Sequence, residues 1–594
     1  MQALVAQRGK WIAAAALVAA VVLPLVLPSF YVHIMVLMVI FAIFAMSLDI
    51  LMGYAGLPSL GHAAFYGTAA YVSGLLTARY GGSWWEGILL ALVCCGLLAA
   101  LFGFVALRTR GLYFLLITLA LAQVLWGATM RWGSFTGGYN GLRGIPKHLE
   151  VLGGTHGAYY LALAIFIVLG GAMYLQMRSP FGLTLQGIRD SESRMQTLGY
   201  NVWLHKYLAF VISALFAGCA GVMSGYYDGF VSPFDLSLMM SADAILMVIL
   251  GGTGTLIGPV IGAVVIVALR NFLSTLMDDW LIVLGVIFIL TVFFAPNGVI
   301  GWFRGRKPES AAVASGGESP TETPMRDLTT AVQVAPAPSR ATASSGVPDL
   351  RLDAVSKMFG GMAAVKDVSF EVQPGERVAI LGPNGAGKTS LFHLISGTLR
   401  PSDGRVYLFG EDVTSRRTDQ RIALGLGRTF QITNLFPSLT VLSNLRLALF
   451  SHAGCRYVMH RTVESLVEIT ERAHALLRDI GLWEVRDVEV RHLSYGHQRQ
   501  LEVVLALALR PRILLLDEPT AGLSVAESAA VVRMIHALDR NITLLIIEHD
   551  MDVAFEVADK VMVFHFGEKL AEGTTGEIRA NPDVRRIYLG RSGR

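Results

Sequence analysis

The pattern of apolar and polar positions divides the chain into two parts. Residues 1–300 are almost continuously apolar, whereas residues 349–594 alternate short apolar runs with polar and charged positions. About ten apolar runs approach the roughly 20 residues that a helix needs to cross a bilayer. They are residues 11–29, 30–52, 60–79, 86–107, 112–130, 158–177, 206–228, 238–250, 256–272 and 278–300. The pattern predicts a polytopic all-α membrane domain followed by a soluble α/β domain.

Two of these runs allow more than one interpretation. The first run follows Arg8 and Lys10, as in a signal peptide, but it is long for one and no small-residue cleavage site follows it. We therefore expect an uncleaved first helix. The run 238–250 is short and leads into the glycine-rich stretch 250–259. It predicts either a helix broken at membrane depth or a tight turn between two ordinary helices.

The charges between the runs predict an orientation. With the N-terminus inside, the inside connections hold Arg8, Lys10, Arg108, Arg110, Arg178, Arg189, Arg194, Lys206, Arg304, Arg306 and Lys307. The outside connections hold Arg79, Arg131, Arg143, Lys147 and Arg270. Because lysine and arginine collect on the cytoplasmic side of membrane proteins, the soluble domain is expected in the cytoplasm. An even number of spans leads to the same side.

Polar positions inside the membrane part are few. Asp49, His62, Gln123 and Asp243 lie within apolar runs, where polar groups are costly. Each is a candidate for lining a path, although hydrogen bonding between helices explains any one of them more simply. The inside loop 178–205 is polar and helical in character. It is either an amphipathic connector or a segment that docks into the soluble domain.

The outside loop 131–157 contains a glycine-rich stretch, Thr136 to Pro146. It is either a surface turn or a contact region for an external partner or the substrate entrance. Residues 305–348 are rich in Ser, Ala, Pro, Thr and Gly, which is typical of a flexible tether. We therefore expect a transmembrane domain at 1–304, a linker at 305–348 and a soluble domain at 349–594.

Composition narrows the class of protein. The chain of 594 residues is 54% hydrophobic and only 15% charged, well below the roughly 25% of soluble domains. Its net charge of +4 and the lack of a long basic run speak against a nucleic-acid partner. The four cysteines have neither metal-ligand nor redox spacing. A lipid bilayer is the expected environment of the first half.

The strongest motif of the soluble half is Gly382 to Thr389, which reads G-x-x-x-x-G-K-[ST]. The apolar run Arg377 to Leu381 precedes it and a run with helical spacing follows, as a phosphate-binding loop requires. Lys388 is expected to reach the phosphates of ATP, and the Thr389 hydroxyl to hold Mg²⁺. The expected ATP contacts are Phe359, Gly382, Pro383, Asn384, Gly385, Ala386, Gly387, Lys388, Thr389 and Ser390.

Further motifs suit ATP hydrolysis. Asp517 and Glu518 end a predicted buried strand, and we expect Asp517 to hold Mg²⁺ and Glu518 to polarise the attacking water. Gln431 is a further candidate for the metal or the water. His549 ends another strand and is a candidate for the γ-phosphate, although a lone histidine is more often structural. Phe359 is either an adenine-stacking residue or a core aromatic.

The stretch Leu493, Ser494, Tyr495, Gly496 and His497 precedes a long helical run. A Ser and a Gly at a helix start form an anion site. With the other motifs in this order, residues 349–594 resemble the nucleotide-binding domain of ABC transporters, whose signature is L-S-G-G-Q. The resemblance implies that this signature acts on ATP bound to a partner domain. His497 and Ser524 depart from the family's usual Gln and Asp, without removing a group that performs hydrolysis.

The membrane part resembles the permeases of branched-chain amino-acid ABC importers in four stretches: Met46 to Phe65, Thr136 to Leu142, Ser179 to Gly182 and Leu250 to Pro259. Asp49 stands where an Asn is usual. The C-terminal stretch 581–590 is similar to the ATPases of the same importers. The resemblance makes the loop 178–205 the coupling region.

The resemblance implies a fused permease and ATPase in the bacterial inner membrane, with its ATPase domain in the cytoplasm. It also implies a periplasmic solute-binding protein, a second permease and a second ATPase, with a homodimer of the fusion as the alternative. Branched-chain amino acids are the expected solutes. Urea, amides or small aromatic and other carboxylates remain alternatives, as do an ABC exporter and a membrane-tethered ATPase without transport. Short inside loops favour import.

Overall fold

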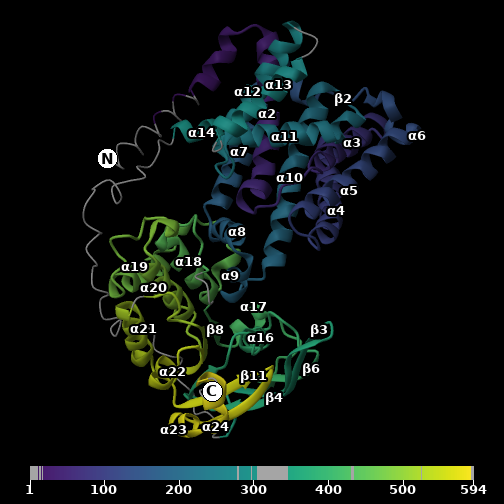
Figure 1. Cartoon of the computed structure of the whole chain (residues 1–594). Helices are drawn as coiled ribbons and strands as arrows, with labels where there is room; N and C mark the ends of the chain where they lie inside the picture. The colour runs from purple at the N-terminus through teal and green to yellow at the C-terminus, as the bar shows by residue number, and fades with distance from the viewer. Residues whose placement is uncertain are drawn as a thin grey trace. The chain divides into compact units, whose positions relative to one another are not determined.

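The computed structural model describes residues 11, 15, 18–276, 280–295, 298–303, 346–429, 434–523 and 525–589. The chain forms two compact units (Figure 1). The first comprises residues 1–185 and 203–315, and the second comprises residues 186–202 and 316–594. A short segment of the membrane sequence, 186–202, therefore belongs to the same compact unit as the phosphate-binding loop.

The first unit is helical. Its helices are α2 (Ser29–Asp49), α3 (Ala63–Arg79), α4 (Trp84–Ala106), α5 (Leu112–Arg131), α6 (Gly133–Thr136), α7 (Gly154–Met177), α10 (Val202–Asp228), α11 (Leu238–Gly251), α12 (Ile257–Leu276), α13 (Trp280–Phe294) and α14 (Gly298–Phe303). Helix α8 (Pro180–Asp190) runs from the first unit into the second. Two short strands, β1 (Leu142–Arg143) and β2 (Phe230–Val231), pair antiparallel.

Among the described residues, six helices are long and apolar enough to cross a membrane: 29–54, 84–106, 112–131, 154–177, 202–228 and 257–276. The expected runs 60–79, 238–250 and 278–300 form shorter helices of 17, 14 and 15 residues. Of the first expected run, residues 12–14, 16 and 17 lie outside the described residues, and residues 18–26 are helical. A helical membrane-type domain is confirmed, whereas the expected number of about ten spans is not.

The glycine-rich stretch after α11 leaves helical geometry. Residues 252–256 are non-helical, and Leu256 has a φ of 57°. A Cβ on Gly262 would lie 1.8 Å from the Met247 carbonyl, and one on Gly251 would lie 1.8 Å from the Gly258 carbonyl. The glycines therefore let α11 and α12 pack backbone to backbone as an antiparallel pair. The break is a tight connection, and it joins a short helix to a full-length one.

The second unit contains a six-stranded sheet in the order β12-β11-β5-β10-β9-β8. Its strands are β5 (Arg377–Leu381), β8 (Leu426–Arg428), β9 (Ile513–Asp517), β10 (Thr543–Ile547), β11 (Lys560–His565) and β12 (Glu568–Thr574). All neighbouring pairs are parallel except β11 with β12. Strands β5, β9 and β10 are buried throughout, as expected for the centre of a parallel sheet.

A second sheet has the order β4-β3-β6-β7, with β3 (Leu350–Phe359), β4 (Met362–Val372), β6 (Asp403–Leu408) and β7 (Glu411–Asp412). From the sequence, we predict two short strands at residues 350–353 and 368–372, with Phe359 between them. That prediction was wrong in extent, because β3 and β4 continue to a tight hairpin whose turn is Gly360-Gly361. Phe359 is the last residue of β3 and pairs with Met362.

Helices complete the second unit: α9 (Glu192–Thr197), α16 (Lys388–Ile395), α17 (Thr418–Ala423), α18 (Val441–His452), α19 (Val467–Asp479), α20 (Tyr495–Leu507), α21 (Val525–Ala537), α22 (Met551–Val557), α23 (Thr575–Ala580) and α24 (Pro582–Leu589). Figure 1 shows α18, α19 and α20 grouped on the opposite side of this unit from β3, β4 and β6. Helix α9 packs against α17.

Candidate functional site

The parallel strands bring the separate motifs to one edge of the sheet. Strand β5 leads into the phosphate-binding loop, β9 ends at Asp517, and β10 ends just before Glu548 and His549. Ile547 is in register with both Asp517 and Ile380, so the three strands end at nearly the same level. The carboxyl ends of parallel strands are where ligands bind in open α/β sheets.

The phosphate-binding loop depends on its glycines. Gly387 has a φ of 97°, and a Cβ there would lie 2.2 Å from the Ala364 carbonyl oxygen. Lys388 is buried at the start of α16, and its Nζ donates to the carbonyls of Gly382 at 2.5 Å and Pro383 at 3.1 Å. The backbone carbonyls of the phosphate-binding loop thus hold the Lys388 ammonium within the loop.

Charges from β9 reach the same lysine. Burial lowers the pKa of Lys388, and the carboxylates of Glu518 and Asp517 oppose that shift. The strand end and the loop therefore form one electrostatic site. Thr389 is exposed and Ser390 half-buried on the first turn of α16.

Asp517 is buried, and burial raises the pKa of its carboxyl to about 6. Arg428 lies 3.7 Å from its Oδ2 and opposes the shift. Its Oδ1 is buried and has no hydrogen-bond partner among the described residues. Mg²⁺ typically binds through one or two carboxylates together with substrate phosphates. An unpartnered carboxylate oxygen at a strand end whose charge acts on Lys388 of the phosphate loop fits such an ion.

Glu518 adopts an unusual backbone conformation. Its φ is 44°, in the left-handed region that non-glycine residues rarely occupy, and its N–H donates to the Ile547 carbonyl at 2.9 Å. Strained residues of this kind cluster at functional sites, where surrounding structure holds them in place. The geometry turns the chain sharply at Glu518, so Glu518 does not continue the strand that Asp517 ends.

His549 is exposed, and its Nδ1 lies 3.8 Å from Glu548 Oε2. Glu548 was not predicted as a site residue. It is fully buried, its pKa is raised by burial, and its Oε1 accepts from the Thr520 hydroxyl at 2.9 Å. It thereby connects the end of β10 to the chain just after Glu518. A carboxylate directly after four apolar strand residues was the sequence signal for it.

The signature residues lie at the start of α20. Ser494 is the N-cap, and its Oγ accepts from the His497 N–H at 3.4 Å. Ser494 and Tyr495 are exposed, while Leu493, Gly496 and His497 are half-buried. Burial lowers the pKa of His497, which favours the neutral imidazole. An exposed helix start capped by a serine hydroxyl suits an anion presented by another molecule.

The remaining predicted residues have mixed outcomes. Phe359 is 46% exposed, and Lys357 Nζ lies 5.4 Å from its ring centroid, so its ring is not a core residue. Gln431 and Ser524 lie outside the described residues. Asn384 and Gly385 are exposed, and Ala386 is buried beneath the loop.

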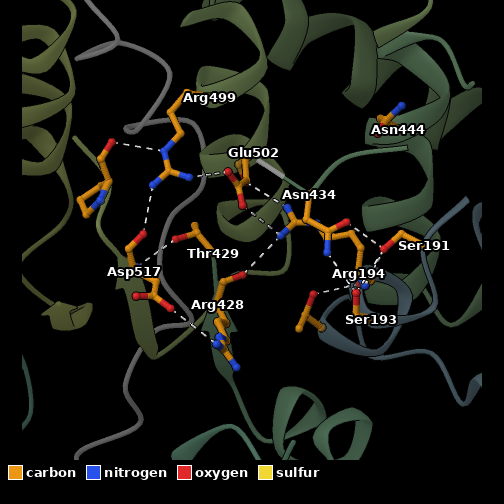
Figure 2. A network of polar contacts seen from close by, with 12 residues as sticks. Ser191, Ser193, Arg194, Arg428, Thr429, Asn434, Asn444, Arg499, Glu502 and Asp517 are labelled. Carbon is orange, nitrogen blue, oxygen red and sulfur yellow. Dashed lines mark hydrogen bonds and ion pairs between the residues drawn. The ribbon is translucent and has the colours of Figure 1, made fainter. Parts of the chain in front are cut away.

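The segment 186–202 docks on the α/β unit, as one interpretation of the loop 178–205 predicted. Ser438 donates to Asp190 Oδ2 from its hydroxyl at 2.5 Å and from its N–H at 3.0 Å. Ser191 donates to Asn434 Oδ1 at 2.8 Å. Arg194, at the centre of this contact, is fully buried (Figure 2). The docking prediction is confirmed.

A cavity of about 350 Å³ lies among α2, α10, α11 and α12 of the first unit. Its wall carries Asp243 Oδ2 and Arg270 Nη1, which lie 3.4 Å apart. The polar lining also includes Asp228, Asp235, Ser224, Ser237, Asn271 and Tyr66. The apolar lining is Leu37, Phe41, Phe234, Met239, Met240, Met247, Ile266 and Val267. Of the predicted intramembrane residues, Asp243 lines this cavity.

The other predicted intramembrane residues are not in the lining of this cavity. His62 Nε2 and Ser47 Oγ form a hydrogen bond of 2.9 Å, and the His62 ring stacks on the Phe44 ring. Asp49 is fully buried. Gln123 is half-buried on α5.

Comparison with known families identifies both parts of the chain. Residues 30–292 match the model of the branched-chain amino acid transport system permease component. Residues 365–521 match the ABC transporter model, and residues 568–593 match the branched-chain amino acid ATP-binding cassette transporter model.

Individual relatives align with the second part. The high-affinity branched-chain amino acid transport ATP-binding protein BraF of Pseudomonas aeruginosa is 36% identical over 250 residues, which is 41% of this chain and 98% of BraF. LivG of Escherichia coli, of the same description, is 38% identical over 253 residues, again 41% of this chain and 98% of LivG. A solved ATP-binding cassette of an ABC transporter in its ADP conformation is 29% identical, covering 41% of this chain and all of that one, with a TM-score of 0.36.

These matches account for the helical membrane part, for the phosphate-binding loop and for the strand end with its two carboxylates. ATP binding and ATP hydrolysis coupled to transport follow from the ATP-binding cassette. The chain is a membrane protein that belongs to the branched-chain amino acid ABC transporter family, with permease and ATPase fused in one polypeptide.

Proposed function

We propose that this protein imports branched-chain amino acids across the bacterial inner membrane at the expense of ATP. The observation that carries the choice of solute is the pair of ATP-binding relatives, BraF and LivG, which are named for high-affinity transport of these amino acids and align over 98% of their length. The proposed organisation is a permease at 1–304, a tether at 305–348 and an ATPase at 349–594.

The cavity of the first unit supports this solute class. A branched-chain amino acid carries an ammonium, a carboxylate and an aliphatic side chain. The cavity wall offers Asp243 and Arg270 for the two charges, and Leu37, Met240 and Ile266 among its apolar surface. Asp228 and Asp243 lie at the ends of α10 and α11 that the positive-inside pattern places outside. Such a cavity suits a zwitterion released from a periplasmic binding protein.

We infer the following roles at the nucleotide site. The phosphate-binding loop and Lys388 bind the phosphates of ATP, and Phe359, exposed at the end of β3, stacks on the adenine. Asp517 and Thr389 hold Mg²⁺, with Gln431 as a further ligand, and the metal neutralises charge on the phosphates. Glu518 polarises the attacking water, and His549 orients it against the γ-phosphate. The signature, Leu493 to His497, closes on ATP held by a second ATPase.

The partners inferred from the family are a periplasmic solute-binding protein, a second permease and a second ATPase, or a second copy of this fusion. The experiment that tests the proposal reconstitutes the assembly in nanodiscs and measures ATP hydrolysis with the cognate binding protein. Leucine, isoleucine or valine on that protein is expected to raise the rate severalfold, with urea, acetamide and benzoate as comparison solutes. Stimulation by one of the comparison solutes alone would overturn the choice of solute.

A further inference from the structure

A buried ion-pair cluster joins the permease-derived segment 186–202 to the carboxylate strand of the ATPase. Arg194 on α9 is fully buried, with 0% of its surface exposed. Its Nη2 donates to the Glu502 carbonyl at 3.2 Å, and its Nη1 lies 3.8 Å from Glu502 Oε1. The Glu502 side chain, on α20, is also fully buried. Figure 2 shows the two side chains pointing toward each other.

The second oxygen of Glu502 continues the cluster. Glu502 Oε2 accepts from Arg499 Nη1 at 2.6 Å. Arg499 in turn donates from Nη2 to the carbonyls of Asp517 at 3.2 Å and Glu518 at 3.0 Å, and from Nε to the carbonyl of Pro519 at 3.2 Å. A single guanidinium therefore holds three successive backbone carbonyls at the strand end that carries both carboxylates.

A shorter route leads to the same aspartate. Arg194 Nη1 donates to the Arg428 carbonyl at 3.5 Å, and Arg428 lies 3.7 Å from Asp517 Oδ2. Both routes start at Arg194 and end at residue 517. Because each group is buried, a missing partner leaves a charge without compensation, which is costly in a protein interior.

We propose that Arg194 is a positioning residue for ATP hydrolysis. It neutralises Glu502 and orients it, so that Glu502 holds Arg499 on the backbone of residues 517–519. The strained turn at Glu518 then stays in the geometry that catalysis needs. Docking of the permease segment thereby sets the catalytic strand end of the ATPase on the same polypeptide. The proposal rests on the roles inferred above for Asp517 and Glu518, and it does not depend on which solute is carried.

The first test measures docking in the full chain. A protease site placed within residues 305–345 is cut after purification through a tag on the permease half, and the fraction of ATPase half retained is measured. Arg194→Ala is expected to lower the affinity between the two halves by a factor on the order of a hundred, which is the usual effect of removing one partner of a buried ion pair. Arg189→Ala is the matched control, because Arg189 lies on the same segment, is partly exposed and donates to Ser438 Oγ at 3.2 Å. It is expected to change retention by less than about threefold.

The second test separates positioning from adhesion. In the uncut, assembled transporter, Arg194→Ala is expected to lower kcat for ATP at least tenfold with KM nearly unchanged, since the contacts described for the Arg194 guanidinium are with residues 428 and 502, which are not part of the phosphate loop. Arg194→Lys, which keeps the charge, should recover part of kcat. The double variant Arg194→Met with Glu502→Gln should lose no more than the worse single variant, because both buried charges are removed together.

The results that would overturn the proposal are specific. Equal kcat and equal retention for Arg194→Ala and Arg189→Ala would remove Arg194 from any role. Weak retention with normal kcat would mean that Arg194 holds the segment 186–202 on the ATPase but does not position the catalytic strand end. Neither retention nor kcat requires the transported solute. If the import proposal fails, both measurements therefore still test the role of Arg194.

Discussion

Asp49 Oδ1 accepts a hydrogen bond from the backbone N–H of Gly254 at 2.7 Å, although the two residues are 205 positions apart. Its Oδ2 accepts from the N–H groups of Thr255 at 3.2 Å and Leu256 at 3.1 Å. Asp49 ends α2 where a π-helical turn, Ile50–Tyr54, begins. One buried carboxylate thus satisfies three backbone donors of the non-helical break after α11, which lipid could not do.

Replacing Asp49 by alanine is expected to destabilise the membrane domain by about 3 kcal/mol or more, because three buried N–H groups lose a charged acceptor. Asp49→Asn should destabilise the domain less than Asp49→Ala does, because one amide oxygen still accepts. It should be less stable than the wild type, since its amide nitrogen cannot accept the bonds made by Oδ2. Thermal unfolding in detergent measures this, and transport should fall in the same order. An unchanged midpoint for Asp49→Ala would show that the break does not depend on this carboxylate.

Two neighbouring glycines of the phosphate loop should differ in their tolerance of a methyl group. Gly387→Ala is expected to abolish ATP binding, because its Cβ would clash with the Ala364 carbonyl at 2.2 Å. Gly385→Ala, at a φ of 82°, would meet no atom within 4 Å and carries only the strain of a left-handed alanine, about 1 kcal/mol. Nucleotide affinity by isothermal titration compares them. Similar affinities for the two variants would contradict the loop geometry.

Glu518→Gln is expected to bind ATP normally and to hydrolyse it at least a hundredfold more slowly, since the amide cannot take a proton from water. Single-turnover hydrolysis in the assembled transporter measures this. Glu556→Gln, a change of the same kind at an exposed position on α22, is the control and should hydrolyse at the normal rate. Near-normal turnover of Glu518→Gln would exclude Glu518 as the base.

The buried Asp517 predicts a pH dependence of Mg²⁺ binding. Its pKa is raised to about 6, so below pH 6 the metal has to displace a proton from this carboxyl. Apparent Mg²⁺ affinity should fall about tenfold per pH unit below 6 and level off above it. Titration of Mg²⁺ into the Glu518→Gln variant with ATP tests this, corrected by the same titration of ATP alone. A protein contribution that is constant from pH 5 to pH 7 would contradict it.

The local motifs could be predicted from the sequence because the residues that form each motif are close together both in the chain and in space. Strand β5 and the phosphate loop it leads into have the predicted bounds, and Asp517 ends a buried strand as expected. The hairpin that joins β3 to β4 was not predicted. Its turn is the glycine pair 360–361, and Met358 and Phe359 just before it lie on exposed strand positions, where no apolar alternation marks a strand.

Long-range partners were not predictable from a single sequence. Arg194 and Glu502 are 308 positions apart, and the sequence around either residue does not indicate the other as its partner. Glu502 in the apolar run of α20 indicated a buried charge that needs a partner, but that partner lies in the permease sequence. The number of spans stays unconfirmed for a related reason. Composition marks α11 as apolar, but its 14 residues are short for a span, and its close packing against α12 is a long-range feature that composition does not show.

ATP-driven uptake into sealed vesicles tests the central claim most directly. Proteoliposomes holding the assembled transporter, with the binding protein and radiolabelled leucine on the binding-protein side and MgATP on the ATPase side, should accumulate leucine above the external concentration. The Glu518→Gln assembly should not accumulate it, although it binds ATP. Accumulation by the Glu518→Gln assembly, or none by the wild-type assembly with any branched-chain amino acid while ATP is hydrolysed, would contradict the account.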